Sequence, residues 1–146
     1  MALWGGRFSS ATRDEVALYS ESISFDKRLY RHDIEGSKAH VKMLAAQGII
    51  PEATCEAIRA ELDNIRRRIE AGDFAYDISM EDIHMHIESA LIDVLGSEGA
   101  RVHSARSRND QVALDIRLYL RDEIDFLIGE LRHFQRALVA QAEANP

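Results

Sequence analysis

Apolar residues recur at steps of three and four along most of the chain, which is the spacing of one face of an α-helix. This pattern predicts helices over about 12–20, 27–47, 51–71 and 79–95, followed by one long helix over 110–144. In the turn GSEGARVHS only RVH could be extended, and three residues are too few to found a sheet. The sequence therefore predicts an all-α fold.

Side chains that cap helices stand near the expected helix starts. Capping-box patterns pair Thr12 with Glu15, Ser79 with Asp82 and Ser107 with Asp110, while Asp26 and Asn109 are single capping candidates. We expect the segment SESISFD, residues 20–26, to form a loop. In the helix that ends near residue 95, the spacing places four side chains in the core: Ile83, Ile87, Leu91 and Val94.

The long helix carries an apolar seam that it cannot bury by itself. A helix over 110–144 would be roughly 50 Å long at about 1.5 Å per residue. A seam of this length calls for partner helices in a bundle or coiled coil. We therefore expect an N-terminal helical module over 1–110 and, over 111–146, the first long helix of a larger bundle. Because the sequence stops at EANP, we expect it to be part of a longer protein.

Composition narrows the class of protein. Hydrophobic residues make up 46% of the chain, charged residues 29%, and the net charge is −7, as in a globular domain without the basic face that nucleic acids or membrane surfaces require. The single cysteine, Cys55, excludes an internal disulfide and a cysteine-rich metal site. No segment approaches the roughly 20 apolar residues of a membrane span. We expect a soluble, cytoplasmic protein with a buried Cys55.

The stretch HSARSRNDQ, residues 103–111, combines several groups suited to an anion. A helix N-terminus offers unpaired N–H groups and a partial positive charge. Arg106 and Arg108 add planar guanidinium groups that match a carboxylate, and Asn109 adds a neutral donor. The alternative is a well-capped helix start with two surface arginines.

Three other segments carry candidate chemistry. In EDIHMHIE, His84 and His86 are two residues apart, so on a helix they point away from each other and cannot share a metal. LWGGRF could deliver Arg7 to a site or could be a packed N-terminal arm. In SESISFD no histidine stands near the serines as a base, so a nucleophilic serine is not supported.

Together, LWGGRF, SISFD, EDIHM and HSARSRNDQ resemble argininosuccinate lyase, in the aspartase/fumarase superfamily, in the same order and with similar spacing. The resemblance covers the whole chain, which matches about the first third of a family member. It implies cleavage of argininosuccinate to arginine and fumarate by β-elimination, without a metal or organic cofactor. It also implies homotetramers built on long central helices, with each active site drawn from three subunits.

The resemblance also assigns residues. It implies that Ser22, Arg108 and Asn109 bind the substrate, with Arg108 on a succinate carboxylate. Residues near the site, in supporting roles, are expected to be Arg7, Asp82, His84, Arg106, Ser107, Asp110 and Gln111. The catalytic serine and a histidine of family members lie in later segments, so we expect no catalytic residue in this chain and no activity from it alone.

Two alternatives stay open on the sequence. One is a non-catalytic structural relative such as a delta-crystallin, which this region does not distinguish from an enzyme. The other is a helical self-association module without a ligand. His86 stands where a small residue is frequent in the family, and we expect it to have little effect.

Overall fold

The computed structural model describes residues 14–145, and every regular element in that range is a helix. The α-helices are α1 (Asp14–Ser20), α2 (Ile23–Asp26), α3 (Tyr30–Ala46), α4 (Glu52–Ala71), α5 (Ile83–Leu95) and α6 (Arg108–Ala144). The 3-10 helices are η1 (Lys27–Leu29), η2 (Ile78–Met80) and η3 (Gly96–His103). The all-α prediction is confirmed.

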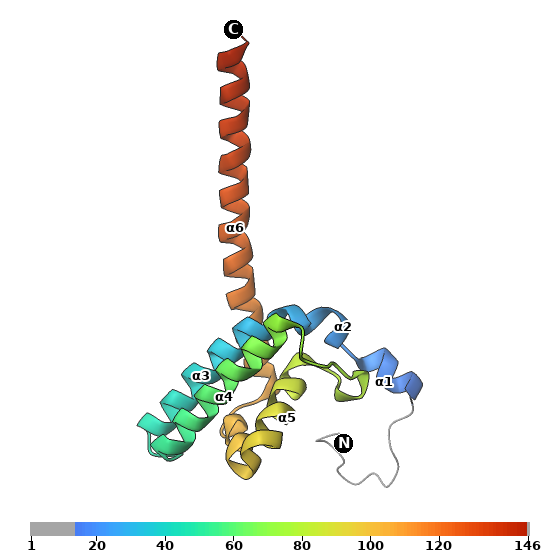
Figure 1. The fold of residues 1–146 in the computed structure, drawn as a ribbon, viewed down its shortest axis with the longest axis vertical. Coiled ribbons are helices and arrows are strands. Elements are labelled where there is room, and N and C mark those ends of the chain that lie inside the picture. The colour runs from blue at the N-terminus through green and yellow to red at the C-terminus, as the bar shows by residue number, and fades with distance from the viewer. Residues whose placement is uncertain (1–13, 146) are drawn as a thin grey trace.

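A compact module is built around the antiparallel pair α3 and α4, with α5 packed against them (Figure 1). Its core contains fully buried aliphatic side chains from all three helices, including Ile34, Leu44, Ile58, Leu62, Ile83 and Leu91. Burying one such side chain stabilises a fold by about 1.5–3 kcal/mol. Cys55 is buried among them, as predicted, but Val94 is 58% exposed, so its predicted place in the core is wrong.

The segment expected to be a loop, residues 20–26, instead contains α2 and leads directly into η1. Asp26 does not cap the following helix. Its buried carboxylate accepts hydrogen bonds from the Ser22 hydroxyl, at 2.6 Å, and from the Ile83 amide, at 3.2 Å. A tertiary contact with the start of α5 thus takes the side chain that the local pattern assigned to a helix cap.

The start of α5 also differs from the prediction. Ser79 lies in η2, and the N-cap is Asp82, whose carboxylate accepts from the Met85 amide at 2.6 Å. Asp82 therefore caps the first turn without the expected capping box, and Asp26 accepts the Ile83 amide of the same turn. The RVH segment, 101–103, belongs to η3 and is not extended.

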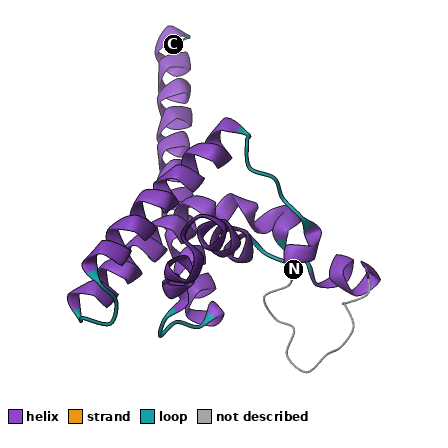
Figure 2. Cartoon of the chain, turned by 60° about the horizontal axis from the view of Figure 1, so that its bottom comes forward, coloured by secondary structure: helices purple, strands orange, loops and turns teal. Residues whose placement is uncertain are grey.

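The long helix α6 starts with the predicted capping box of Ser107 and Asp110. It rises from the module as a straight rod (Figure 1; Figure 2, seen from below). Only its first turns are packed: Gln111 and Asp115 are buried, and Asp122 pairs with His32 of α3 at 3.0 Å. Beyond that point its apolar side chains are more than half exposed at Ile124, Leu127, Leu131, Phe134 and Leu138. The seam that the sequence predicts is present and uncovered by residues 14–145.

None of the helices between residues 14 and 145 combines the length and apolarity needed to span a bilayer. The segment LWGGRF with Arg7, and the capping candidate Thr12, lie outside the described residues.

Two glycines give a matched test of this packing. A Cβ added at Gly99, in η3, would clash with the Leu91 carbonyl oxygen, whereas one added at Gly129, in α6, would meet nothing within 4 Å. Gly99→Ala should lower the free energy of unfolding by more than roughly 2 kcal/mol. Gly129→Ala should leave it equal or raise it by up to about 1 kcal/mol. Denaturant titration followed by circular dichroism measures both, and equal effects would contradict the packing of η3 on α5.

Candidate functional site

The sequence-predicted residues converge where the starts of α5 and α6 meet the segment that carries α2. Asp82 and His84 come from α5, Arg108 and Asn109 from the first turn of α6, and Ser22 from the residue before α2. Hydrogen bonds join the α2 segment to the start of α5, and ion pairs join the start of α5 to α6.

Ser22 is held at both its backbone and its side chain. The Ser22 amide donates a hydrogen bond to the Glu81 carbonyl at 2.8 Å, and its hydroxyl donates to the Asp26 carboxylate. The same carboxylate accepts a hydrogen bond from the Ile83 amide. Burial raises the pKa of Asp26 above its ordinary value, because the hydrogen bonds from Ser22 and Ile83 offset only part of the desolvation. The serine is thereby fixed beside the N-terminus of α5.

Arg108 bridges α6 and α5. Its Nε lies 3.3 Å from Oδ2 of Asp82, its Nη2 lies 3.7 Å from Oε2 of Glu88, and its Nη1 donates to Oε1 of Gln111 at 2.6 Å. The Arg108 side chain is 22% exposed, and its buried Nη2 makes no hydrogen bond within residues 14–145, so it retains a donor that a ligand could use. Asn109, in the same turn, is exposed. A fixed cation beside an exposed amide can receive a carboxylate without a search over side-chain rotamers.

Arg106 does not behave as a surface arginine. Its side chain is 4% exposed, its Nη1 donates to the Ser37 hydroxyl at 2.8 Å, and its Nε lies 3.6 Å from Oδ1 of Asp110. Of the two alternatives read from the sequence, the one with two surface arginines is wrong for Arg106. This arginine joins α3 to the start of α6.

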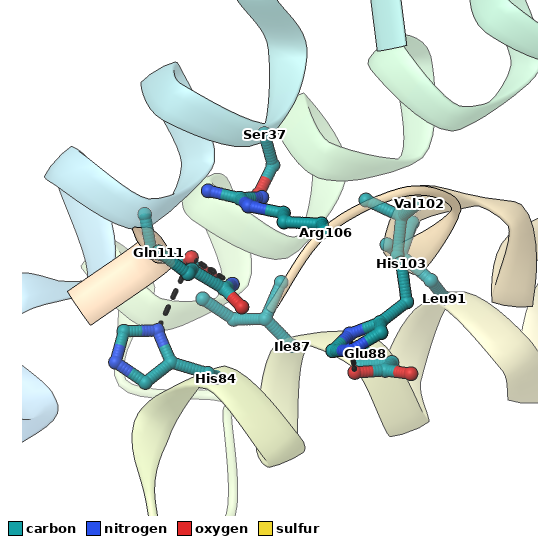
Figure 3. A pocket seen from close by; sticks show the side chains of 10 residues that line it. Ser37, His84, Ile87, Glu88, Leu91, Val102, His103, Arg106 and Gln111 are labelled. Atoms are coloured by element: carbon teal, nitrogen blue, oxygen red, sulfur yellow. Dashed lines mark hydrogen bonds and ion pairs between the residues drawn. The ribbon is translucent and has the colours of Figure 1, made fainter. Parts of the chain in front are cut away.

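A buried charge cluster, defined here as Asp33, His84 and Asp115, lies directly beneath these residues. Nδ1 of His84 is 3.2 Å from Oδ1 of Asp33 and 3.4 Å from Oδ2 of Asp115, and all three side chains are at most 2% exposed. The amide of Gln111 donates to Oδ1 of Asp33 at 2.5 Å. Figure 3 shows His84 pointing toward Gln111 across a small cavity, with Arg106 on its far side.

The three members of the cluster shift one another's protonation. Burial opposes ionisation of Asp33, but hydrogen bonding and charge from His84, with help from Gln111 and Arg106, hold its pKa below the ordinary value. Desolvation likewise opposes a positive charge on His84. The hydrogen bond and negative charge of Asp33 outweigh this desolvation and raise the pKa of His84. Burial and the nearby Asp33 raise the pKa of Asp115 to about 7. The cluster thus favours an ionised Asp33 beside a protonated His84, and it keeps the carboxyl group of Asp115 protonated to a higher pH than usual.

Sequence reasoning singled out His84 but not its two carboxylate partners. Asp33 and Asp115 stand beside the apolar faces of their helices, at positions that local patterns assign to ordinary surface charge. A polar side chain one step from a predicted core position was the available signal, but helical spacing alone does not say which carboxylates meet the histidine.

Two groups of described residues offer metal-ligand atoms within 4.8 Å of one another: Asp33 with His84 and Asp115, and Glu52 with Cys55 and Glu56. In the first group Asp33 already accepts from Gln111, and the positive charge of Arg106 lies beside both carboxylates. A second cation would be repelled there, so we assign no metal. His86 hydrogen-bonds to the Asp77 amide and the Asp82 carbonyl, whereas His84 faces Asp33 and Asp115, so the two rings point to different partners as helical spacing predicts.

Comparisons with known protein sequences identify the family of this chain. A sequence model of the lyase family matches residues 6–146, and the chain belongs to that family. Within it, the chain is 54% identical over 141 residues to argininosuccinate lyase of Thioalkalivibrio sulfidiphilus, covering 97% of this chain and 30% of the relative. It is 52% identical over 143 residues to the chloroplastic argininosuccinate lyase of Arabidopsis thaliana, covering 98% of this chain and 28% of the relative. The chain therefore spans less than a third of the length of these relatives.

The raised pKa of Asp115 gives a stability prediction. Its ordinary pKa is 3.8 and its pKa in the folded chain is about 7, so the folded state binds more protons between these values. The contribution of Asp115 to stability therefore falls as pH rises from about 4 to 7, by up to roughly 1 kcal/mol per pH unit. Asp115→Asn, which mimics the protonated acid, should flatten the pH dependence of unfolding in that window.

The matched control is Asp125→Asn at an exposed position of the same helix, which should leave the slope unchanged. Urea denaturation at a series of pH values measures both variants. An unaltered slope in Asp115→Asn would show that Asp115 is ionised throughout the window in the folded chain.

Proposed function

We propose that this chain is the N-terminal portion of an argininosuccinate lyase and supplies part of its substrate-binding surface. The observation that carries the proposal is Arg108, held between Asp82 and Glu88 at the start of α6, with an Nη2 that makes no hydrogen bond and with exposed Asn109 as its neighbour. Identity of 54% to argininosuccinate lyases supports the choice of substrate. The overall reaction would release arginine and fumarate from argininosuccinate.

The chemistry of β-elimination explains why such a surface is needed. A base removes a weakly acidic proton beside a carboxylate, and the resulting charge spreads into that carboxylate before an acid protonates the departing guanidinium nitrogen. Fixed donors that face the developing charge lower this barrier. We propose that Arg108 and Asn109, at the positive end of the α6 dipole, bind the succinate carboxylate, and that Ser22 binds the substrate from the α2 side.

The remaining predicted residues fit supporting roles. Ser107 and Asp110 fix the first turn of α6, Gln111 connects Arg108 to Asp33, and Arg106 ties the turn to α3. Asp82 and His84 place the start of α5. The base and the acid would come from segments of the family that follow those present here, and we propose no cofactor.

We further propose that the full-length protein is a homotetramer in the cytoplasm. The exposed seam of α6 supports the assembly, because a helix with more than half-exposed Ile124, Leu131 and Phe134 requires a partner surface. The single, buried Cys55 suits a reducing compartment.

Substrate binding can be tested on the chain itself. Titration with fumarate, followed by NMR, should shift the amide signals of Arg108 and Asn109. Arg108→Ala should weaken that binding about tenfold or more, since a charge-assisted hydrogen bond contributes about 1.5–3 kcal/mol. Arg117→Ala, at an exposed position further along α6, is the matched control at equal ionic strength and should bind as the unsubstituted chain does.

The chain alone should release no fumarate from argininosuccinate above background. Turnover by the purified chain, free of any full-length enzyme, would show that its own residues supply the base and acid. Saturable binding that Arg108→Ala leaves intact would place the ligand elsewhere. Failure to bind fumarate or arginine at all would favour the helical self-association module.

The exposed seam makes a separate prediction about assembly. The chain should self-associate at high concentration, as measured by light scattering. Leu131→Glu, which puts a charge in the middle of the seam, should reduce the association. Arg136→Glu, which the three-four spacing places on the opposite face, should not. A stable monomer at high concentration would contradict the role of the seam.

A further inference from the structure

The segment that connects α4 to α5 ends in a short strap, defined here as residues 77–82, and this strap contacts the proposed site at two points. The Glu81 carbonyl accepts the amides of Ser22, at 2.8 Å, and Ile23, at 3.0 Å. The next residue, Asp82, pairs with Arg108. The position of the strap therefore decides where Ser22 and Arg108 lie relative to each other.

The strap does not hold this conformation through local geometry alone. Glu81 has a φ of +64°, in the left-handed region that side chains other than glycine rarely adopt. Such a backbone persists only where the surroundings fix it. In the described structure one side chain forms hydrogen bonds at both ends of the strap.

That side chain is His86, one turn into α5 and 1% exposed. Its Nε2 accepts the Asp77 amide at 2.9 Å, and its Nδ1 lies 2.7 Å from the Asp82 carbonyl oxygen. Its ring packs edge-on against Tyr76, with centroids 5.5 Å apart. The imidazole thus spans the strap from its first residue to its last.

The partners also determine the proton on the ring. A backbone amide can only donate, so Nε2 must carry a lone pair, and a carbonyl can only accept, so Nδ1 must carry the hydrogen. We infer that His86 is a positioning residue: as the neutral Nδ1–H tautomer, it fixes both ends of the strap and thereby sets Ser22 and Asp82 for the substrate. The link to substrate rests on the proposed function, whereas the hold on the strap does not.

From the sequence we expect a histidine at position 86 to have little effect, whereas the structure gives this side chain a positioning role. A ring that merely filled space would need neither nitrogen in a particular state, because an aromatic side chain of similar size would serve equally well. The two hydrogen bonds distinguish the cases, since each requires one nitrogen in one protonation state.

The first test is the tautomer of His86 in the unsubstituted chain. A long-range ¹H–¹⁵N NMR spectrum near neutral pH should show a protonated Nδ1 and an unprotonated Nε2 for this ring. The Nε2–H tautomer, a charged ring or averaging between tautomers would overturn the inference. This measurement needs neither a variant nor a substrate, so it stays decisive if the proposed function fails.

The second test uses two substitutions that each restore one end. In His86→Gln the side-chain oxygen can reach the place of Nε2 and accept from Asp77, whereas in His86→Asn the shorter amide replaces only Nδ1. Hydrogen exchange of the Asp77 amide should accelerate about tenfold in His86→Asn and much less in His86→Gln. The amides of Ser22 and Ile23 should follow, since they donate to the strap.

Amides in the middle of α4, such as those of Ile58 and Leu62, report on the core and should be nearly unchanged. Equal acceleration there would mean that His86 supports overall stability and not the strap, which would overturn the inference. So would an unprotected Ser22 amide in the unsubstituted chain, or identical behaviour of the Asn and Gln variants.

Discussion

The ion pair between His84 and Asp33, closed by Asp115, is the contact on which the rest of the arrangement depends. It joins α5, α3 and α6 at one buried point, and no other cluster in residues 14–145 brings charged side chains of these three helices together out of water. Removing one partner of such a pair leaves an uncompensated buried charge, which costs about 3–5 kcal/mol. Because α6 packs on the module only through its first turns, this cluster and the contacts of Tyr119 and Asp122 with His32 are what hold the long helix to the module.

The same cluster explains why the candidate site is built above it. Gln111 donates to Asp33 from one end of its amide and accepts from Arg108 at the other, so the buried charge helps to position the guanidinium of Arg108. Arg106 then closes the turn onto Ser37. Of the two arginines in the RSRND stretch, Arg106 has a side chain that is 4% exposed and joins two helices, whereas the side chain of Arg108 is 22% exposed. Identical side-chain chemistry two residues apart therefore has two different uses, and only the tertiary contacts tell them apart.

Helical spacing and capping patterns in the sequence predict much of the fold. Helical spacing gave the main helices and most of their buried side chains, and the capping box of Ser107 and Asp110 stands where its pattern predicts. The failures share one physical cause. Asp26, Ser79 and Val94 were assigned from neighbours in sequence, but Asp26 bonds to a residue 57 positions away, and the tertiary fold leaves Val94 exposed. Asp33 and Asp115 were missed in the site for the same reason, since only packing brings two carboxylates to one histidine.

The candidate site is assembled from several elements of the fold. The strap positions Ser22, whereas Asp82, Glu88 and Gln111 position Arg108. His84 is positioned by carboxylates of α3 and α6, so the candidate groups are held by contacts between several elements. A surface held in this way is organised before any substrate arrives, which is the condition under which fixed donors lower a barrier. It contains donors and paired charges, but its most strongly buried acid, Asp115, faces His84 and the core. If the proposed function holds, the groups that move protons on the substrate would therefore approach from the solvent side, where Asn109 is exposed.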